Sequence, residues 1–166
     1  PWAHFCRTKG AVKMHTLLNL SGNIPEYLLI TDGKRSDASV LDNISPLPGA
    51  YYVMDRAYVD FRRLYLLHSL KADFVTRARS NLQYQRQYSH PAEKEHGILC
   101  DQTIFLTGVQ TANHYPEYLR RIKYHDAEGR TLVFLTNDFS LPPMAVAQLY
   151  KGRWHIELFF KWIKQH

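Results

Sequence analysis

The sequence contains no long apolar run. No window approaches about 18 uncharged apolar residues, the length that a membrane-spanning helix needs. The first residues, PWAHFCRTKG, lack the apolar centre of a signal peptide. We therefore expect no membrane span and no export, and we expect the protein in the cytoplasm.

Cysteine is scarce, and histidine is scattered. Cys6 and Cys100 stand far apart, without a C-x-x-C pair or the neighbours of a zinc site, which indicates two reduced, cytosolic thiols. His15, His68 and His155 have no partners at metal-ligand spacing. Neither a zinc site nor a histidine-ligated metal is therefore predicted.

The sequence does contain enough apolar residues for a core, and it carries an excess of positive charge. With 166 residues, 45% of them hydrophobic, the chain suits a single domain over 1–166. The formal net charge of +6 favours a polyanionic partner. Because the chain begins with Pro1 and ends inside an apolar helical pattern, we expect it to be part of a longer protein, truncated at both ends.

The first half alternates strand and helix patterns. Loose apolar alternation over 11–20 and 26–31, on either side of a polar turn, predicts a hairpin. The segment YYVMD is a buried-strand candidate that ends at Asp55. A helical period follows over FRRLYLLHSLK with Asp60 as its N-cap, and ADFVTRAR is again strand-like. This order of strand, helix and strand predicts a mainly α/β sheet.

Between Ser80 and Asn137 the pattern changes. QYQRQYSHPAEKEH is polar, whereas TIFLTGV, YLRRIKYH and TLVFLTN have the apolar content of strands, and DAEGR joins the last two. We therefore predict an antiparallel β insertion over 80–137. Pro142 and Pro143 then open one long helix, since proline is tolerated in a first helical turn.

That last helix carries a polar stripe in the stretch YKGRWHIELFFKWIK. At about 100° per residue, Tyr150, Arg153, Glu157 and Lys164 fall within an arc of about 60°. One interpretation is an ordinary surface ion pair between Arg153 and Glu157, worth a few tenths of a kcal/mol. The other residues of the helix are largely apolar, as in a helix that packs on several sides. We therefore expect the stripe to line a cleft.

Asp55 is the second candidate site residue. It stands at the carboxyl end of a predicted buried strand, where α/β sheets place ligands. The helix-cap role is better filled by Asp60, which leaves Asp55 free. Asp55 and Glu157 could then share Mg²⁺ or Mn²⁺, hard cations that prefer oxygen ligands. A two-metal site would stabilise both the attacking and the leaving oxygen of a phosphoryl transfer.

Basic and aromatic neighbours suit a nucleic acid. Arg153 and Lys164 could contact phosphates on either side of the scissile one, and Tyr150 or Trp154 could stack on a base. Packing in the core is an equally weighted alternative for Trp154.

These residues carry a resemblance. The spacing of Tyr150, Arg153, Glu157 and Lys164 matches the Y-(2)-R-(3)-E-(6)-K signature of bacterial insertion-sequence transposases with DDE chemistry. MDRAYVDF, around Asp55, resembles the second-Asp motif of that family, and PWAHFCRTKGAVKMHTLL and LLITDGKRSDASVLD also resemble its sequences. The resemblance covers nearly the whole chain.

The resemblance implies a ribonuclease H-like core: a mixed sheet with flanking helices and a β-rich insertion before the Glu-bearing helix. It implies metal-dependent DNA cleavage and strand transfer by three carboxylates with Mg²⁺ or Mn²⁺, in which Asp55 is the second acid and Glu157 the third. Tyr150, Arg153 and Lys164 would contact DNA. A homodimer in the DNA complex and a location near the bacterial nucleoid are further expectations.

One departure concerns the first acid. In the family it lies in a strand just upstream of the segment that resembles PWAHF, so we expect that strand and acid to be missing and the chain alone to be catalytically silent. Asp32 and Asp37 are the only early candidates for a replacement, and turn or capping roles suit them better. Ser36 or Asp37 would cap a short helix over 38–44.

Two alternatives stay open at this point. The chain could be a non-catalytic DNA-binding remnant of a transposase, or part of a related metal-dependent nuclease that hydrolyses DNA without joining it. Arg7, Lys9 and Lys13 could also touch DNA, although a solvated basic edge explains them more simply.

Overall fold

The structure is a computed structural model that describes residues 12–22 and 24–165. Its strands form two sheets, a two-stranded one and a six-stranded one with the order β3-β4-β8-β7-β6-β5. The strands are β1 (Val12–Asn19), β2 (Ile24–Asp32), β3 (Tyr51–Met54), β4 (Asp73–Arg77), β5 (Tyr84–His90), β6 (Ile98–Leu106), β7 (Leu119–His125) and β8 (Thr131–Thr136). The α-helices are α1 (Phe61–Ser69), α2 (Val109–His114), α3 (Pro143–Gly152) and α4 (Trp154–Gln165). Three short 3₁₀-helices are η1 (Asp37–Asn43), η2 (Arg56–Tyr58) and η3 (Lys94–His96).

The larger sheet is mixed. β3 and β4 run parallel and are joined by α1, whereas β4 to β8 and all pairs within the insertion are antiparallel. A parallel pair needs a crossover, and α1 supplies it. The helix begins where the side chain of Asp60 accepts a hydrogen bond from the backbone N–H of Arg63, at 3.1 Å. The predicted α/β class, the β1–β2 hairpin and the antiparallel insertion strands are confirmed.

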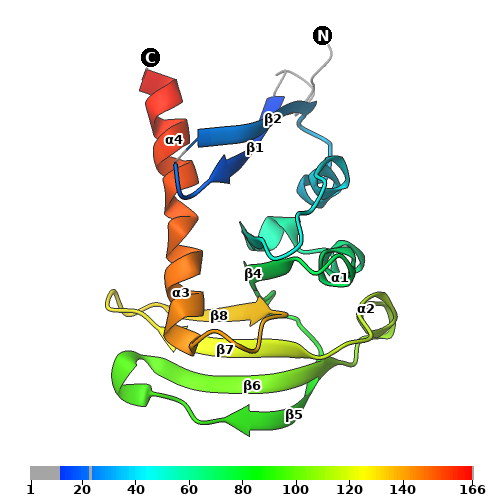
Figure 1. Ribbon diagram of the computed structural model, residues 1–166, viewed down its shortest axis with the longest axis vertical. Helices are drawn as coiled ribbons and strands as arrows, with labels where there is room; N and C mark the ends of the chain where they lie inside the picture. Colours follow the sequence, from blue (N-terminus) through cyan, green and yellow to red (C-terminus); the bar gives the residue numbers. More distant parts are fainter. Residues whose placement is uncertain (1–11, 23, 166) are drawn as a thin grey trace.

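Two apolar cores cover the two faces of this sheet. Adjacent residues of β4 point to opposite faces, so Phe74 packs with α1 and with Tyr115, the residue after α2, while Val75 packs with α3. Both side chains are fully buried. In Figure 1, α3 lies against the larger sheet, and α4 continues in nearly the same direction to reach the β1–β2 hairpin. The helix pair therefore connects the two sheets.

The prediction of a single long helix after Pro142 is wrong in one respect: the structure divides this helix at Arg153 into α3 and α4. The N–H of Arg153 donates to the carbonyl of Tyr150, and the N–H of Ile156 donates to that of Arg153, each at 3.1 Å. These are tight, three-residue turns. A Cβ on Gly152 would lie 2.9 Å from Cδ1 of Leu20, so the hairpin approaches the helix closely at this junction.

One strand and one α-helix of the structure were not predicted. β5 occupies a stretch expected to be polar and irregular, and it forms the outer edge of the sheet with mostly exposed side chains. α2 is a helix of six residues within TGVQTANHY. β6 also begins earlier than the segment TIFLTGV, at Ile98.

Candidate functional site

Asp55 stands at the end of β3, where the polypeptide leaves the sheet. Its Oδ1 accepts a hydrogen bond from the backbone N–H of Arg56 at 2.6 Å, so Asp55 caps η2. The expectation that Asp55 would be free of a capping role is therefore wrong. Asp55 and Asp60 each begin a helix, and the short 3₁₀-turn was not visible as a period in the sequence. Among the described residues, none donates a hydrogen bond to Asp55 Oδ2.

Tyr150 reaches Asp55 from α3. Its hydroxyl donates to Asp55 Oδ1 at 3.4 Å, across 95 positions of sequence. The ring is buried, and its centroid lies 5.0 Å from that of Phe134 on β8. Burial raises the pKa of Tyr150, and the charge of Asp55 raises it further, while Arg153 and Arg77 oppose the shift. The phenol is therefore held as a protonated donor towards the carboxylate.

Arg153 and Glu157 form an ion pair beside this contact. Arg153 Nη2 lies 2.6 Å from Glu157 Oε1, and the two side chains are 24% and 42% exposed. Burial lowers the pKa of Arg153, but the hydrogen bond to Glu157 and the nearby Tyr150 and Asp55 outweigh that effect, so the net shift is upward. The Nε of Arg153 is buried and has no hydrogen-bond partner among the described residues.

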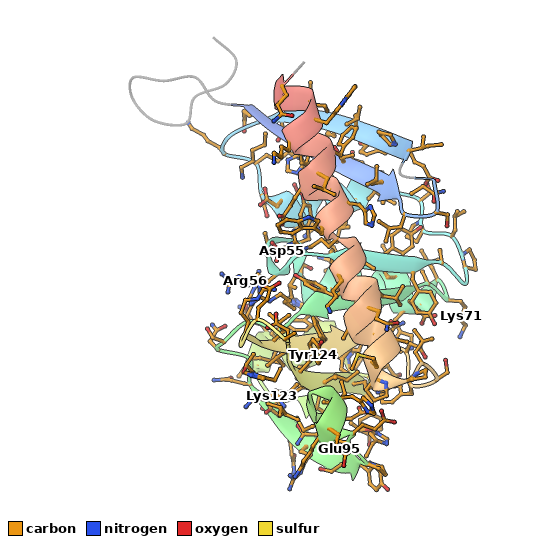
Figure 2. All side chains as sticks on the ribbon, turned by 90° about the vertical axis from the view of Figure 1, so that its left-hand side faces the viewer. Asp55, Arg56, Lys71, Glu95, Lys123 and Tyr124 are labelled. Atoms are coloured by element: carbon orange, nitrogen blue, oxygen red, sulfur yellow. The ribbon has the colours of Figure 1, made fainter. Side chains whose placement is uncertain are left out.

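The polar stripe and the strand end thus meet. The guanidinium of Arg153 lies 5.7 Å from the ring centroid of Tyr150, so the contacts run from Asp55 through Tyr150 and Arg153 to Glu157. Figure 2 shows Asp55 beside the two helices. The arrangement offers carboxylate oxygens next to a partly buried cation, a combination that can serve either a metal ion or an anionic ligand.

The apolar residues of α4 differ from the expectation of a helix packed on several sides. Trp154 is 57% exposed, so the core-packing alternative for it is wrong. Leu158 and Trp162, four and eight positions further on, are also exposed. One face of α4 is therefore open to solvent. The side chain of Lys164 lies outside the part of the chain that the structure describes.

The other early candidates have structural contacts. Asp32 Oδ1 accepts from the backbone N–H groups of Lys34 and Arg35, each at 3.0 Å, which confirms its turn role. Asp37 pairs with Lys13 at 3.0 Å, and neither Asp37 nor Ser36 makes the predicted side-chain cap of η1. Arg7, Lys9 and Cys6 lie outside the described residues.

His15 and His68, for which no metal partners were predicted, form hydrogen bonds with hydroxyl groups. Nε2 of His15 lies 3.0 Å from Thr31 Oγ1, and its Nδ1 lies 3.1 Å from the hydroxyl of Tyr58. His68 Nδ1 lies 2.7 Å from the hydroxyl of Tyr115. Over residues 12–22 and 24–165, no group of three or more His, Cys, Asp or Glu side chains is arranged to hold a metal ion. Within the same residues, no helix has the length and apolarity that a membrane crossing requires.

Sequence reasoning missed the basic residues at the end of β4. The register pairs Met54 with Thr76, so Arg77 is the next residue along β4 just as Asp55 follows β3. Arg77 therefore lies beside the end of β3, and its charge lowers the pKa of Tyr150 against the effect of burial. The segment TRAR, in which basic residues end an apolar strand, was the available signal.

Comparison with known proteins identifies the family of this chain. Residues 3–166 match the model of the transposase DDE domain. A protein of Sinorhizobium fredii, named as a transposase, is 37% identical over 169 residues, covering 99% of this chain and 47% of its own length. A protein of Geobacillus stearothermophilus, named as a transposase for an insertion sequence element, is 28% identical over 171 residues, covering all of this chain and 44% of its own.

The chain therefore spans less than half the length of these relatives. Its six-stranded mixed sheet with flanking helices is consistent with the ribonuclease H-like architecture of such domains. Since the family model matches almost the whole chain, this protein belongs to the transposase DDE domain family.

Proposed function

We propose that this chain is the catalytic core of an insertion-sequence transposase that cuts DNA strands and joins them to a target in a metal-dependent reaction. The observation that carries the proposal is the set of contacts that links Asp55, at the end of β3, to Glu157 on α4. Membership of the transposase family supports DNA as the substrate.

The donor atoms suit a hard divalent cation. Asp55 Oδ2 accepts no hydrogen bond from the described residues, and Glu157 is engaged by Arg153 through Oε1. Asp55 and Glu157 would hold Mg²⁺ or Mn²⁺ through carboxylate oxygens. When bound, such a cation polarises phosphoryl oxygens and lowers the pKa of a coordinated water. We propose that the remaining acid, the first of the three, comes from another part of a longer protein, so the 166-residue chain alone should not cleave DNA.

The neighbouring residues have separate roles in this proposal. Tyr150 orients the Asp55 carboxylate by donating a hydrogen bond to it. Arg153, whose Nε is buried without a partner, would donate to a DNA phosphate, and Lys164 would contact a second one. The exposed ring of Trp154 would stack on a base. Two copies of the longer protein would bind the two transposon ends.

The test uses the longer protein with Asp55→Asn and Glu157→Gln. Amides keep the size of the carboxylates but remove their charge, so each variant should lose strand cleavage in Mg²⁺ by at least about a thousandfold, as expected when a carboxylate ligand of the metal is lost. DNA affinity in a buffer with a chelator should stay within about threefold of wild type, since no phosphate contact is removed.

A variant that cuts transposon ends at nearly the wild-type rate would show that its carboxylate is structural. Asp42→Asn is the matched control, because Asp42 is an exposed acid that pairs with Arg63 at 2.6 Å and lies outside the cluster. A strand-joining assay with target DNA separates a transposase from a nuclease that only hydrolyses. A wild-type protein that binds DNA but neither cuts nor joins it would indicate a DNA-binding remnant.

A further inference from the structure

A second basic feature lies where β4 leaves the sheet. A pocket of about 210 Å³ is lined by Ala78, Arg79, Ser80, Leu82, Tyr84, Arg121 and Val133. Its walls come from the segment after β4 and from three strands of the insertion, β5, β7 and β8. We refer to it as the Arg79–Arg121 pocket.

Both guanidinium groups of this pocket are held by uncharged partners. Arg79 Nη2 donates to the carbonyl of Val59 at 2.8 Å. Arg121 Nη1 donates to Gln102 Oε1 at 3.0 Å, and its guanidinium lies 5.0 Å from the centroid of the Tyr84 ring. These contacts fix the side chains without neutralising them.

Several other arginines of the described chain are paired with carboxylates. Arg63, Arg120 and Arg130 each lie within 3.0 Å of an aspartate oxygen. Among the described residues, no carboxylate forms an ion pair with Arg79 or Arg121. Two preorganised and unneutralised guanidiniums in one hollow make a site for an anion with several acceptor oxygens.

The pocket lies at the same end of the sheet as the candidate metal ligands. Val59, which accepts from Arg79, is four positions after Asp55 in the loop that follows β3. In the strand order, β7 is three places from β3, which corresponds to about 14 Å along the sheet at about 4.8 Å per strand. Leu82 and Tyr84 of the pocket pack with the core on the α1 face, whereas Tyr150 packs with the core on the α3 face, so pocket and Tyr150 lie on opposite faces at this end of the sheet. Lys123 lies two residues after Arg121 on β7, and Figure 2 shows it on the same side of the molecule as Asp55 and Arg56.

We propose that the Arg79–Arg121 pocket binds a backbone phosphate of the DNA on which Asp55 and Glu157 act, a few nucleotides from the cut. The inference rests on the proposed function and extends it to the β insertion. Lys123 follows Arg121 on β7 and adds a further positive charge beside the pocket. A phosphate site next to such a charge suits a DNA strand that crosses this end of the sheet. Tyr84 and Leu82 give the pocket an apolar wall against which a deoxyribose can pack.

The first experiment measures DNA binding by fluorescence anisotropy with a labelled duplex, using the wild-type chain, Arg79→Gln and Arg121→Gln. Each pocket variant should bind about five- to tenfold more weakly and should lower the slope of log affinity against log salt by about one. Arg130→Gln is the matched control, because Arg130 is exposed and paired with Asp126 and Glu128. The control should bind like wild type. Arg121→Lys keeps the charge and should recover part of the loss.

The outcomes separate this proposal from the function on which it rests. If both pocket variants bind like Arg130→Gln while Arg153→Gln binds weakly, the pocket assignment is wrong and the proposed function stands. If the wild-type chain shows no salt-dependent DNA binding, the proposed function fails as well. If Arg121→Gln loses binding of inorganic phosphate, measured by ³¹P line width, but keeps DNA affinity, the pocket is a small-anion site and the DNA proposal is overturned.

A second measurement needs no substitution and remains decisive if Arg121→Gln does not fold. The thiol of Cys100 lies 3.3 Å from Arg121 Nη1 and is partly exposed. Saturating duplex DNA should therefore slow alkylation of Cys100, followed by peptide mass spectrometry, by about threefold or more, as expected when an interface excludes solvent. Alkylation at an unchanged rate with DNA bound would overturn the proposal.

Discussion

At the scale of single residues, Asp55 serves the fold and the candidate site together. Its Oδ1 accepts hydrogen bonds from the backbone N–H of Arg56, which caps η2, and from the hydroxyl of Tyr150. Its Oδ2 accepts no hydrogen bond from the described residues. A carboxylate that is held by one oxygen keeps a fixed direction for the second. This preorganisation matters because a ligand misplaced by about 1 Å can reduce a rate by about a hundredfold.

Removal of the Tyr150 hydroxyl tests whether this side chain orients the Asp55 carboxylate. Tyr150→Phe keeps the ring against Phe134 but removes the donor to Asp55, and at 3.4 Å the lost hydrogen bond should lower the free energy of unfolding by only about 0.5 kcal/mol. Cleavage by the longer protein should fall by about tenfold or more, because Asp55 is less well oriented. Urea unfolding and a strand-nicking assay measure the two effects. Equal cleavage by Tyr150→Phe and wild type would remove the positioning role of this hydroxyl.

His15 makes stability depend on pH. Burial lowers its pKa from the usual value of 6.5, although Asp37 opposes the shift. The unfolded chain therefore takes up a proton more readily than the folded one, so the contribution of His15 is complete above about pH 6.5 and is lost as pH falls through the lowered pKa. Urea unfolding between about pH 7.5 and about pH 5 should show this decline. It should be smaller in His15→Gln, and an identical profile in that variant would contradict the prediction.

At the scale of elements, a helix whose N-cap side chain accepts a backbone hydrogen bond should lose stability when that side chain is removed. Asp60→Ala removes the acceptor for the Arg63 N–H at the start of α1, and it should lower the free energy of unfolding by about 1 kcal/mol. Ser36→Ala is the matched control, because Ser36 makes no side-chain cap hydrogen bond to η1. Chemical denaturation should show a lower midpoint for Asp60→Ala alone. Equal midpoints for both variants would mean that tertiary packing, rather than the cap, holds the first turn of α1.

The helices and strands that could be predicted are those whose own residues show the apolar spacing of a helix or a strand. The β1–β2 hairpin and the strands β7 and β8 alternate or cluster apolar residues, and α1 repeats them at 3.6 residues over a buried face. β5 escaped prediction because an edge strand exposed on both faces needs no apolar alternation. α2 is too short to display a helical period.

The same distinction applies to the candidate site. The contact between Arg153 and Glu157 could be predicted, because residues four positions apart face each other on a helix. The contact of Tyr150 with Asp55 joins residues 95 positions apart, and it depends on how α3 packs across β3 and β4. The break at Arg153 lies where Leu20, far away in the sequence, approaches Gly152, and the Arg79–Arg121 pocket depends on strand register. Single-sequence patterns do not contain that information.

At the scale of the whole molecule, α3 and α4 connect two sheets that share no strand pairing. The β1–β2 hairpin contacts the rest of the described chain through Leu20 at Gly152 and through His15 at Tyr58. Tyr58 belongs to η2, which Asp55 caps. The hairpin, the strand end and the helix pair therefore meet near the candidate metal ligands, so displacement of the hairpin would disturb the site as well as the fold.

Positive charges without a carboxylate partner gather at one end of the larger sheet, and they determine which surface should attract DNA. Arg56, Arg77, Arg79, Arg121 and Lys123 form no ion pair with a carboxylate among the described residues. They stand near the ends of β3, β4 and β7. The net charge of +6 is thus available in part at the end of the sheet that carries Asp55. Such a field attracts polyanions before any specific contact forms.

Salt titration tests this charge arrangement on the whole chain. If four side chains, Arg79, Arg121, Arg153 and Lys164, each displace counterions from one phosphate, the slope of log affinity against log salt should be about −3.6. Affinity for a duplex of unrelated sequence should then fall about 150-fold between about 50 mM and about 200 mM salt. Arg153→Gln should reduce the slope by about one, because it removes one charge-assisted phosphate contact. Binding that is equally tight at both salt concentrations would mean that these cations do not face the DNA.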